Sequence, residues 1–454
     1  MRALFAFLTS FVLATALSAV AHAQTLIRDT EIEQMLHDYT EPLLVAAQLN
    51  PNDVGLYVIA DPEINAFVTG GQNIFMHTGT ILEANSPNML KGVIAHETGH
   101  ISGAHLARMG DSQRAAMVPA YVSIGLGLLA ALAGEGGAAS ALIASSQQFA
   151  MLSFLSYNRT QESSADQAGL QFLQATGQSG IGLVEFFERF AYQEAFTPAA
   201  RFPYFRSHPL SSQRVSALRD RVEASDYPVA NDSPEEIARL RRLQGKIYGF
   251  LARPQAVFLR YPPENQSIEA RYARSVAYYQ NAELTRARAE IETLIEEEPD
   301  NPFFYELYGQ MLFESGHADE AIAYHQRSVE LLPEAPLLRV NLAMAMIASE
   351  DSAHLDAARE NLQIAISREQ DNAFAWYQLS IVHERSGETA LAQLAIAEQA
   401  YSIGNRSRAF QFAMRARPDL ESGTPAWYRA SELVAVSQPT EREMREMRRQ
   451  RRQQ

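Results

Sequence analysis

The spacing of apolar residues in the first part of the chain predicts helices mixed with short strands. From Ile32 to Ala47 apolar residues recur at the period of a helix. Two short apolar runs, Gly55 to Ile59 and Ala66 to Thr69, read as strands, with Pro62 and Gly70-Gly71 as punctuation. A small sheet beside a helix is therefore expected here.

Two longer helices are expected further along. Ser86-Pro87 is a typical helix start, and apolar residues follow it on one side of the predicted helix. A second helix is predicted from about Asn158 to Ala175, stopping at Gly177. Ser207-His208-Pro209-Leu210 interrupts the next helical stretch, and Pro234 marks a boundary soon afterwards.

A hydrophobic region separates these two helices. Met117 to Ala133 contains no charged residue, and a second run of small apolar residues follows a glycine-rich break and extends to Ala144. A bilayer-spanning helix needs about 20 such residues, so a true span is the least favoured interpretation. We expect a hydrophobic hairpin over 117–144, which is either buried in the domain or makes peripheral contact with a membrane surface.

From Ile268 onward the chain is repetitive. Small residues and prolines recur at fixed positions in units that begin at Ile268, Pro302 and Ala373, and the unit from Pro336 carries about three extra residues. The positions match a helix-turn-helix unit of about 34 residues, the tetratricopeptide repeat. Such units stack into an all-α solenoid because none can bury its own apolar face. Its concave surface usually binds a peptide or another protein; the alternative is a purely architectural layer.

The two ends of the chain differ from the rest. Residues 1–23 combine a positive start, an uncharged apolar run and Ala21-His22-Ala23, which predicts a cleaved signal peptide; the alternative is an uncleaved anchor. Residues 24–230 are then expected to form the first domain and residues 231–433 the repeat domain. Residues 434–454 contain six arginines and predict a solvated, disordered tail.

Charge and composition narrow the class of function. The net charge of −15 disfavours nucleic acid as a partner, because phosphate binding needs a basic face. The chain has no cysteine, so any metal must be held by histidine, aspartate or glutamate. An exported protein without cysteine fits the bacterial periplasm, where disulfides are permitted but not required.

The segment His96-Glu97-Thr98-Gly99-His100 carries the strongest chemical signal. On a helix, His96 and His100 project from one face and can bind one metal ion, while Glu97 can reach a water beside that ion as a general base. Zinc lowers the pKa of such a water and polarises a peptide carbonyl. Gly99 costs roughly 1 kcal/mol of helix propensity relative to alanine, which suggests the close approach of a neighbouring helix.

A zinc peptidase needs a third protein ligand. Leu106 stands where metzincins have histidine, and Gln161 stands where the thermolysin-like Asn-Glu pair would need asparagine. Glu162 and Asp166, however, are four residues apart on the helix predicted over 158–175 and share a face. We expect Glu162 to complete a His-His-Glu set with one open position. Asp166 is expected to accept the spare N–H of a ligand imidazole.

These motifs resemble a known family. The pattern R-x-x-E-x-x-A-D from Arg159, following HExxH with a hydrophobic region between them, resembles the CAAX prenyl protease and HtpX-like gluzincins, including exported members with C-terminal tetratricopeptide repeats. The chain departs from many members at Ser164, where they have a second glutamate. The resemblance covers the mature chain. It implies an α+β zincin-type peptidase domain, mainly helical with a small sheet, followed by an all-α tetratricopeptide-repeat solenoid.

The resemblance also implies roles for individual residues. Asn65, Ala66 and Phe67 would lie on the strand edge along which a substrate is added as a further strand. His208 is similar to the family's histidine that can occupy the open zinc position in a resting, self-inhibited state. His105 and His77 stay unassigned, with packing or polar contacts in the substrate cleft expected rather than metal binding.

The predicted function is a periplasmic zinc-dependent endopeptidase with one Zn²⁺ per chain. Its expected substrates are misfolded or stalled outer-membrane and periplasmic proteins recruited by the repeats, and the outer-membrane assembly machinery is an expected partner of the repeats. The alternative is a chaperone-like adaptor in outer-membrane protein assembly, for which proteolysis is secondary. Zinc content and the activity of a Glu97 variant separate the two.

Overall fold

The computed structural model describes most of the chain, which divides into two compact units. The described residues are 26–105, 107–108, 122–124, 159–196, 208, 210–349 and 351–438. Unit 1 is Met1–Arg28 with Glu33–Leu240, and unit 2 is Asp29–Ile32 with Arg241–Gln454. The predicted signal peptide, nearly all of the 117–144 hairpin and the tail beyond residue 438 lie outside the described residues.

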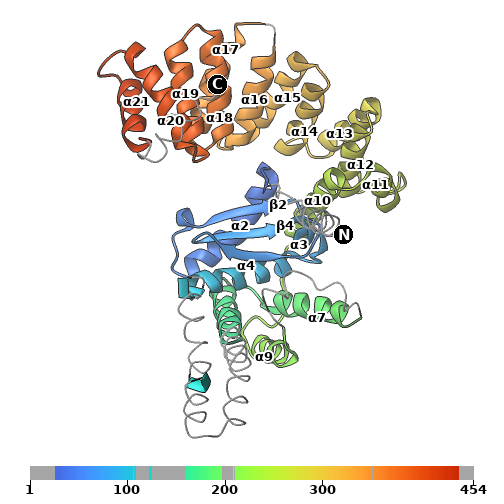
Figure 1. The fold of residues 1–454 in the computed structure, drawn as a ribbon. Coiled ribbons are helices and arrows are strands. Elements are labelled where there is room, and N and C mark those ends of the chain that lie inside the picture. Colours follow the sequence, from blue (N-terminus) through green and yellow to red (C-terminus); the bar gives the residue numbers. More distant parts are fainter. Residues whose placement is uncertain are drawn as a thin grey trace, which may run out of the picture. The chain divides into compact units, whose positions relative to one another are not determined.

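Unit 1 contains a four-stranded mixed sheet in the order β1-β2-β4-β3 (Figure 1). The strands are β1 (Leu26–Ile27), β2 (Gly55–Ile59), β3 (Ala66–Thr69) and β4 (Asn73–His77). β2 and β4 are parallel, whereas β1 pairs antiparallel with β2 and β3 pairs antiparallel with β4. Strands β2 and β3 have the predicted bounds, and β3 is an edge strand of the described sheet.

The helices of unit 1 carry most of the residues that the sequence singled out. They are α2 (Thr30–Ala46), which begins within unit 2, α3 (Thr78–Glu83), α4 (Pro87–Ser102), residues 159–175, α7 (Ile181–Phe196) and α9 (Ser212–Glu223), together with the 3-10 turn η1 (Pro51–Asp53). Helix α4 begins where predicted, because the side chain of Ser86 accepts a hydrogen bond from the backbone N–H of Met89. It packs against β3, β4 and α7.

Helix α4 and the 159–175 helix pack with their backbones in contact. A Cβ atom on Gly99 would lie 2.5 Å from the carbonyl oxygen of Ala165, and one on Gly169 would lie 2.9 Å from that of Ala95. Only a residue without a side chain fits at either point. The close approach predicted from Gly99 is confirmed, and it places the polar faces of the two helices side by side.

Helix α7 is fixed to the start of α4 by one buried side chain. The amide of Asn88 donates to the carbonyl oxygen of Ser179 over 2.8 Å and accepts from the backbone N–H of Gly182, also over 2.8 Å. The second bond satisfies an N–H group in the first turn of α7, where a helix leaves such donors unpaired. The contact sets the position of α7 along α4.

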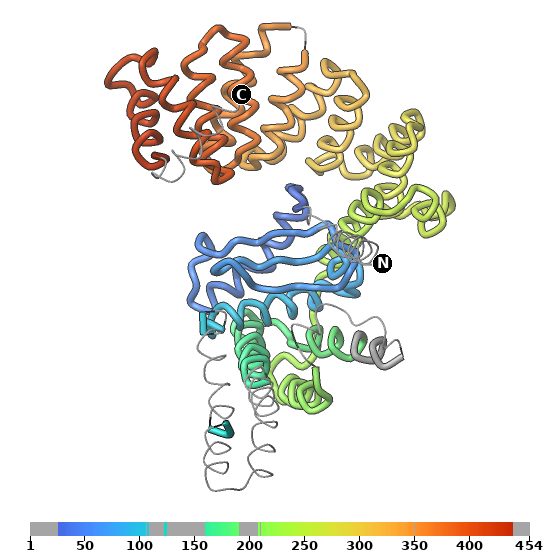
Figure 2. Tube along the Cα trace, in the orientation of Figure 1, coloured from blue at the N-terminus to red at the C-terminus, as the bar shows by residue number. Residues whose placement is uncertain are grey.

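Unit 2 consists of successive helices, which pack as antiparallel pairs from α12 onward (Figures 1 and 2). Helix α10 (Pro234–Leu251) begins in unit 1 and continues in unit 2. The helices that follow it are α11 (Pro254–Arg260), α12 (Ile268–Gln280), α13 (Leu284–Glu297), α14 (Pro302–Glu314), α15 (Ala318–Leu331), α16 (Pro336–Ala348), α17 (His354–Arg368), α18 (Ala373–Arg385), α19 (Thr389–Ser402), α20 (Arg406–Ala416) and α21 (Pro425–Val436), with the 3-10 turn η2 (Arg417–Asp419).

The predicted repeats correspond to four of these pairs. Ile268, Pro302, Pro336 and Ala373 are the first residues of α12, α14, α16 and α18, as the repeat register requires. The extra residues of the third unit fall between α16 and α17. The predicted fold class, a mainly helical domain with a small sheet followed by an all-α repeat array, is confirmed. The pair α20 and α21 extends the array beyond the repeats that the sequence revealed.

Buried charges hold the short segment 29–32 in unit 2. The ammonium group of Lys246 lies 2.7 Å from Asp29 and 3.3 Å from Glu31, and Arg242 contacts Glu31 over 2.8 Å. The hydroxyl of Tyr272 donates to the same Glu31 carboxylate over 3.1 Å. These partners satisfy a carboxylate that is fully buried. Within the described residues, no helix combines the length and apolar composition needed to cross a bilayer.

Replacing Gly99 by alanine is expected to destabilise unit 1, although alanine is the better helix former. The new methyl group would meet the backbone of Ala165, so the 159–175 helix would have to move. Overpacking of this kind costs roughly 1–3 kcal/mol, measurable as a lower urea midpoint. Ser164→Ala, on the exposed side of the same helix, is the control and should change stability by less than about 0.5 kcal/mol. A Gly99→Ala protein as stable as wild type would show that the helices are not in contact.

Candidate metal centre

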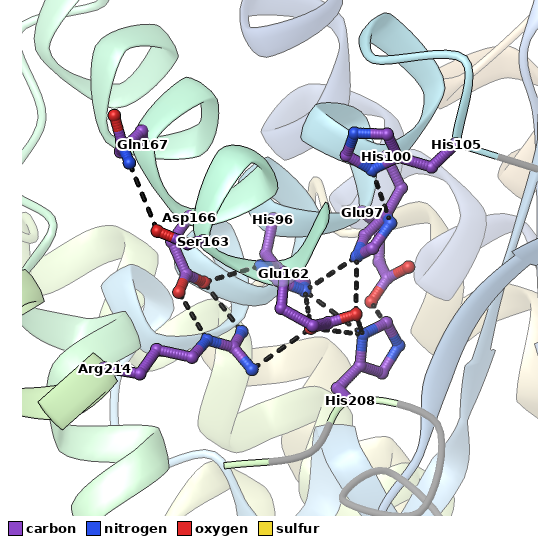
Figure 3. A network of polar contacts seen from close by, with 10 residues as sticks. All are labelled: His96, Glu97, His100, His105, Glu162, Ser163, Asp166, Gln167, His208 and Arg214. Atoms are coloured by element: carbon purple, nitrogen blue, oxygen red, sulfur yellow. Dashed lines mark hydrogen bonds and ion pairs between the residues drawn. The ribbon is translucent and has the colours of Figure 1, made fainter. Parts of the chain in front are cut away.

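Three segments of unit 1 bring the predicted residues into one buried cluster (Figure 3). Helix α4 supplies two histidines and a glutamate, the 159–175 helix supplies two acids, and one histidine precedes α9. The cluster consists of His96, Glu97, His100, Glu162, Asp166 and His208. All but His100 are at most 5% exposed. Side chains that are 112 residues apart in the sequence, such as His96 and His208, are thus in contact.

Four of these side chains converge on one point. The Nε2 atom of His96 lies 3.1 Å from Nε2 of His100 and 3.2 Å from Nδ1 of His208. The Glu162 carboxylate lies 3.4 Å from each of the two α4 histidines and 3.1 Å from Nδ1 of His208. Nitrogen and oxygen ligands at tetrahedral zinc are about 3.3 Å apart, since each bond is about 2.0–2.1 Å long. The cluster has the dimensions of such a site.

The buried charges also fit a divalent cation. Glu97, Glu162 and Asp166 are three buried carboxyl groups, and Arg214 is the buried guanidinium that faces two of them. Arg214 contacts Asp166 through two nitrogens and Glu162 over 3.1 Å. With all three acids ionised and the histidines neutral, as metal binding requires, two negative charges remain uncompensated. Such a group is costly to bury unless a cation balances it.

The pKa values of the cluster are shifted in both directions: burial and the nearby His96 hold the pKa of His100 well below its usual range. Burial alone would lower the pKa of His96, but its bonds to Asp166 and Glu162 raise the pKa to about 9. Burial would raise the pKa of Glu162, yet the nearby His208 and His96 hold that pKa well below its usual range. Burial does prevail at Glu97, where it raises the carboxyl pKa. An acid with a raised pKa is suited both to accept and to return a proton.

A second layer of contacts orients His96. Its Nδ1 atom lies 2.9 Å from a carboxylate oxygen of Asp166, so Nε2 faces the cluster. Arg214, at the start of α9, fixes Asp166 in turn. The guanidinium of Arg214 stacks 4.8 Å above the ring of Phe187 on α7, which also packs edge-on against His96. Arg214 was not predicted, because nothing local distinguishes it from Arg219 or Arg221 on the same helix.

The ring of His208 contacts Glu97 through one nitrogen and His96 and Glu162 through the other (Figure 3). Its Nδ1 faces the cluster, and its Nε2 lies 3.5 Å from a carboxylate oxygen of Glu97. Neither oxygen of Glu97 has a hydrogen-bond partner among the described residues. In this arrangement His208 fills the place beside Glu97 that the predicted mechanism assigns to water.

The other histidines singled out by the sequence do not join the group of four side chains that could hold a metal ion in the described part of the chain. His105 is buried, and its Nδ1 lies 3.0 Å from Nδ1 of His100. His77, the last residue of β4, is buried with its ring packed edge-on against Phe67.

The predicted substrate-binding residues lie at the edge of the sheet. Ala66 and Phe67 belong to β3, and Asn65 precedes it. The backbone carbonyl of Asn65 accepts from the N–H of His77. Strand β3 pairs with β4 on one side, and the described residues contribute no strand to its other side. Helix α4, which carries HExxH, packs against the same strand. The free edge of β3 therefore belongs to a strand in contact with the HExxH helix.

Comparisons with known proteins agree with this geometry. Residues 29–222 match the model of peptidase family M48. Beta-barrel assembly-enhancing proteases of Yersinia pestis and Escherichia coli K12 are 26% and 28% identical over 328 and 330 residues. In both cases the match covers 71% of this chain and 66% of the relative, just under two thirds of its length.

A solved structure also resembles part of the chain. The tetratricopeptide-repeat protein YrrB is 14% identical, and the match covers 49% of this chain and 96% of that one. Its TM-score is 0.29, so this likeness gives no further support to the helix pairing described above. The helix pairs and the family match lead to one conclusion: the chain carries a peptidase family M48 domain, followed by tetratricopeptide-like helical repeats.

Proposed function

We propose that this protein is a zinc-dependent endopeptidase of the bacterial cell envelope, acting in the periplasm. The observation that carries the proposal is the convergence of His96, His100 and Glu162 at tetrahedral spacing, with the buried Glu97 beside them. The apolar start of the chain supports export, and the relatives named above support a location in the envelope.

Each residue of the cluster has a role in this proposal. His96 and His100 would hold zinc through Nε2, and Glu162 through its carboxylate. Zinc supplies the electrophile that peptide hydrolysis needs at neutral pH, lowering the pKa of water and polarising the scissile carbonyl. Glu97 takes the proton from the attacking water and delivers it to the departing amine nitrogen. Asp166 keeps the His96 ring in place, and Arg214 keeps Asp166 in place.

Substrates are proposed to bind as an added strand on β3, with Asn65, Ala66 and Phe67 at the contact. A free strand edge offers backbone N–H and C=O groups, so it binds extended segments with little regard to their side chains. This suits an enzyme that removes misfolded or stalled outer-membrane and periplasmic proteins, because such proteins share extended conformation rather than a sequence motif.

His208 is proposed to hold the centre in a resting state. Its Nδ1 stands at the fourth corner of the ligand set, and its Nε2 points to Glu97. A water and a substrate carbonyl need the same place. His208 must therefore leave before hydrolysis can begin, and its departure is the proposed step of activation.

Unit 2, which carries the repeats, supports a second role, that of a chaperone-like adaptor in outer-membrane protein assembly. It contains a cavity of about 620 Å³ whose apolar lining includes Trp376, Leu379 and Leu394. Phe374 and Tyr377 on α18 are 49% and 45% exposed. Exposed aromatic residues are typical of binding surfaces. We propose that the repeats recruit substrates or bind the outer-membrane assembly machinery; if this is the main role, loss of Glu97 will leave the cellular function intact.

Glu97→Gln is expected to abolish proteolysis while zinc stays bound. The amide cannot accept the proton of the attacking water, and removal of a general base costs about 10²- to 10⁴-fold in rate. Casein cleavage and the zinc content of the purified protein are the two measurements. Glu185→Gln, an exposed acid on α7, is the matched control and should behave as wild type. Equal cleavage by wild type and Glu97→Gln would rule out the proposed mechanism.

His208→Ala is expected to keep one zinc per chain and to cleave casein, or itself, faster than wild type. Removal of the ring frees the place beside Glu97 for water, while the other three ligands remain. Initial rates and zinc content measure this, with the exposed His317→Ala as the control. Loss of zinc from His208→Ala would instead identify His208 as an ordinary ligand.

A further inference from the structure

The chain makes an unusual turn immediately after the HExxH helix. Helix α4 ends at Ser102, and two residues later Ala104 adopts a φ of +50°. A residue with a Cβ atom adopts this left-handed conformation only where its surroundings hold it there. The turn directs His105 back towards the last turn of α4, whereas a continued helix would point it to a different face.

His105 is placed against the rear of the second HExxH histidine. Its Nδ1 lies 3.0 Å from Nδ1 of His100, and the two rings meet edge to face. The side chain of His105 is buried. A Cβ atom on Gly103 would lie 2.4 Å from Nε2 of His105, so the glycine provides the room that the ring occupies. The position of the His105 ring thus depends on the missing side chain at Gly103 and on the left-handed turn at Ala104.

This contact matches the tautomer that metal binding requires of His100. Nε2 of His100 faces His96 and Glu162, so a metal bound there leaves the proton on Nδ1. That N–H points at Nδ1 of His105, which can accept it when His105 carries its own proton on Nε2. Metal-binding histidines regularly donate their second N–H to such an acceptor, which fixes the ring. Asp166 occupies the corresponding place behind His96.

We propose that His105 is the positioning residue of the second metal ligand: it accepts the Nδ1–H of His100 and so holds Nε2 towards the metal. The proposal rests on the proposed zinc site. It assigns His105 no contact with metal or substrate, because His105 lies outside the group of four whose ligand atoms converge.

Two substitutions separate this role from simple packing. His105→Leu fills similar space but offers no acceptor, whereas His105→Asn can place its side-chain oxygen near the position of the imidazole Nδ1. Zinc affinity is measured by competition with a chelator, and the ligand field by the visible absorption of the Co²⁺-loaded protein. Thermal unfolding of the metal-free protein reports on packing. Ala104→Gly, which relieves the left-handed turn without touching the acceptor, is the control.

We expect His105→Leu to bind zinc about 10- to 100-fold more weakly than wild type and to change the Co²⁺ spectrum. His105→Asn should recover most of the affinity and the wild-type spectrum, and Ala104→Gly should match wild type in both. Wild-type affinity in His105→Leu would overturn the proposal. So would an equal loss in both His105 variants that follows their loss of metal-free stability. If wild type itself binds no stoichiometric zinc, the proposed function fails, and this inference fails with it.

Discussion

The backbone contact between α4 and the 159–175 helix is the constraint on which the rest of the site depends. Gly99 against Ala165 and Gly169 against Ala95 leave no room for a side chain between the helices. Each helix carries its polar residues four apart, at positions 96 and 100 and at positions 162 and 166. Facing pairs therefore meet at 2.9–3.4 Å. One added methyl group would separate the helices by more than a metal–ligand bond tolerates.

The close packing of the two helices also brings charged side chains together out of water. This explains why the cluster needs further residues that compensate these charges. Acids and imidazoles forced together out of water are stable only if every charge has a partner. Arg214 binds Asp166 and Glu162, Asp166 binds His96, and His208 reaches both Glu162 and Glu97. With all three acids ionised and the histidines neutral, the cluster still lacks two positive charges. We infer that binding of a divalent ion and stability of unit 1 are linked, as in other proteins whose metal ligands are buried together.

The predictable parts of the structure are those that leave a periodic or local signal. The strands β2 and β3, the start of α4 and the first residue of four repeats follow from apolar spacing, a capping serine and a repeat of about 34 residues. The short β4 was not predicted. It spans five residues with a polar residue at each end, and it depends on parallel pairing with β2, which leaves no local pattern.

Two side chains of the site, Arg214 and His105, likewise have contacts that leave no local pattern in the sequence. Arg214 is 48 residues from its partner Asp166, and tertiary packing, which includes that of α9 on α7, brings them together. The contact of His105 with His100 could not be predicted from helical spacing, because it depends on the left-handed turn at Ala104. Pattern alone thus reveals which residue types can perform the chemistry. The residues that orient them are determined by tertiary packing.

The placement of His208 has an energetic consequence for activation. In the proposed resting state His208 contacts both the other residues of the cluster and Glu97, so opening the centre would require free energy from another interaction. A substrate can supply it only by binding the open state more tightly than the closed one. Strand addition on β3 meets this condition if the scissile carbonyl occupies the corner that His208 vacates, because the substrate and the histidine then compete for one place. If the proposed binding to the repeats is the same in both states, it does not meet this condition: it would raise the local concentration of substrate but leave the balance at His208 unchanged.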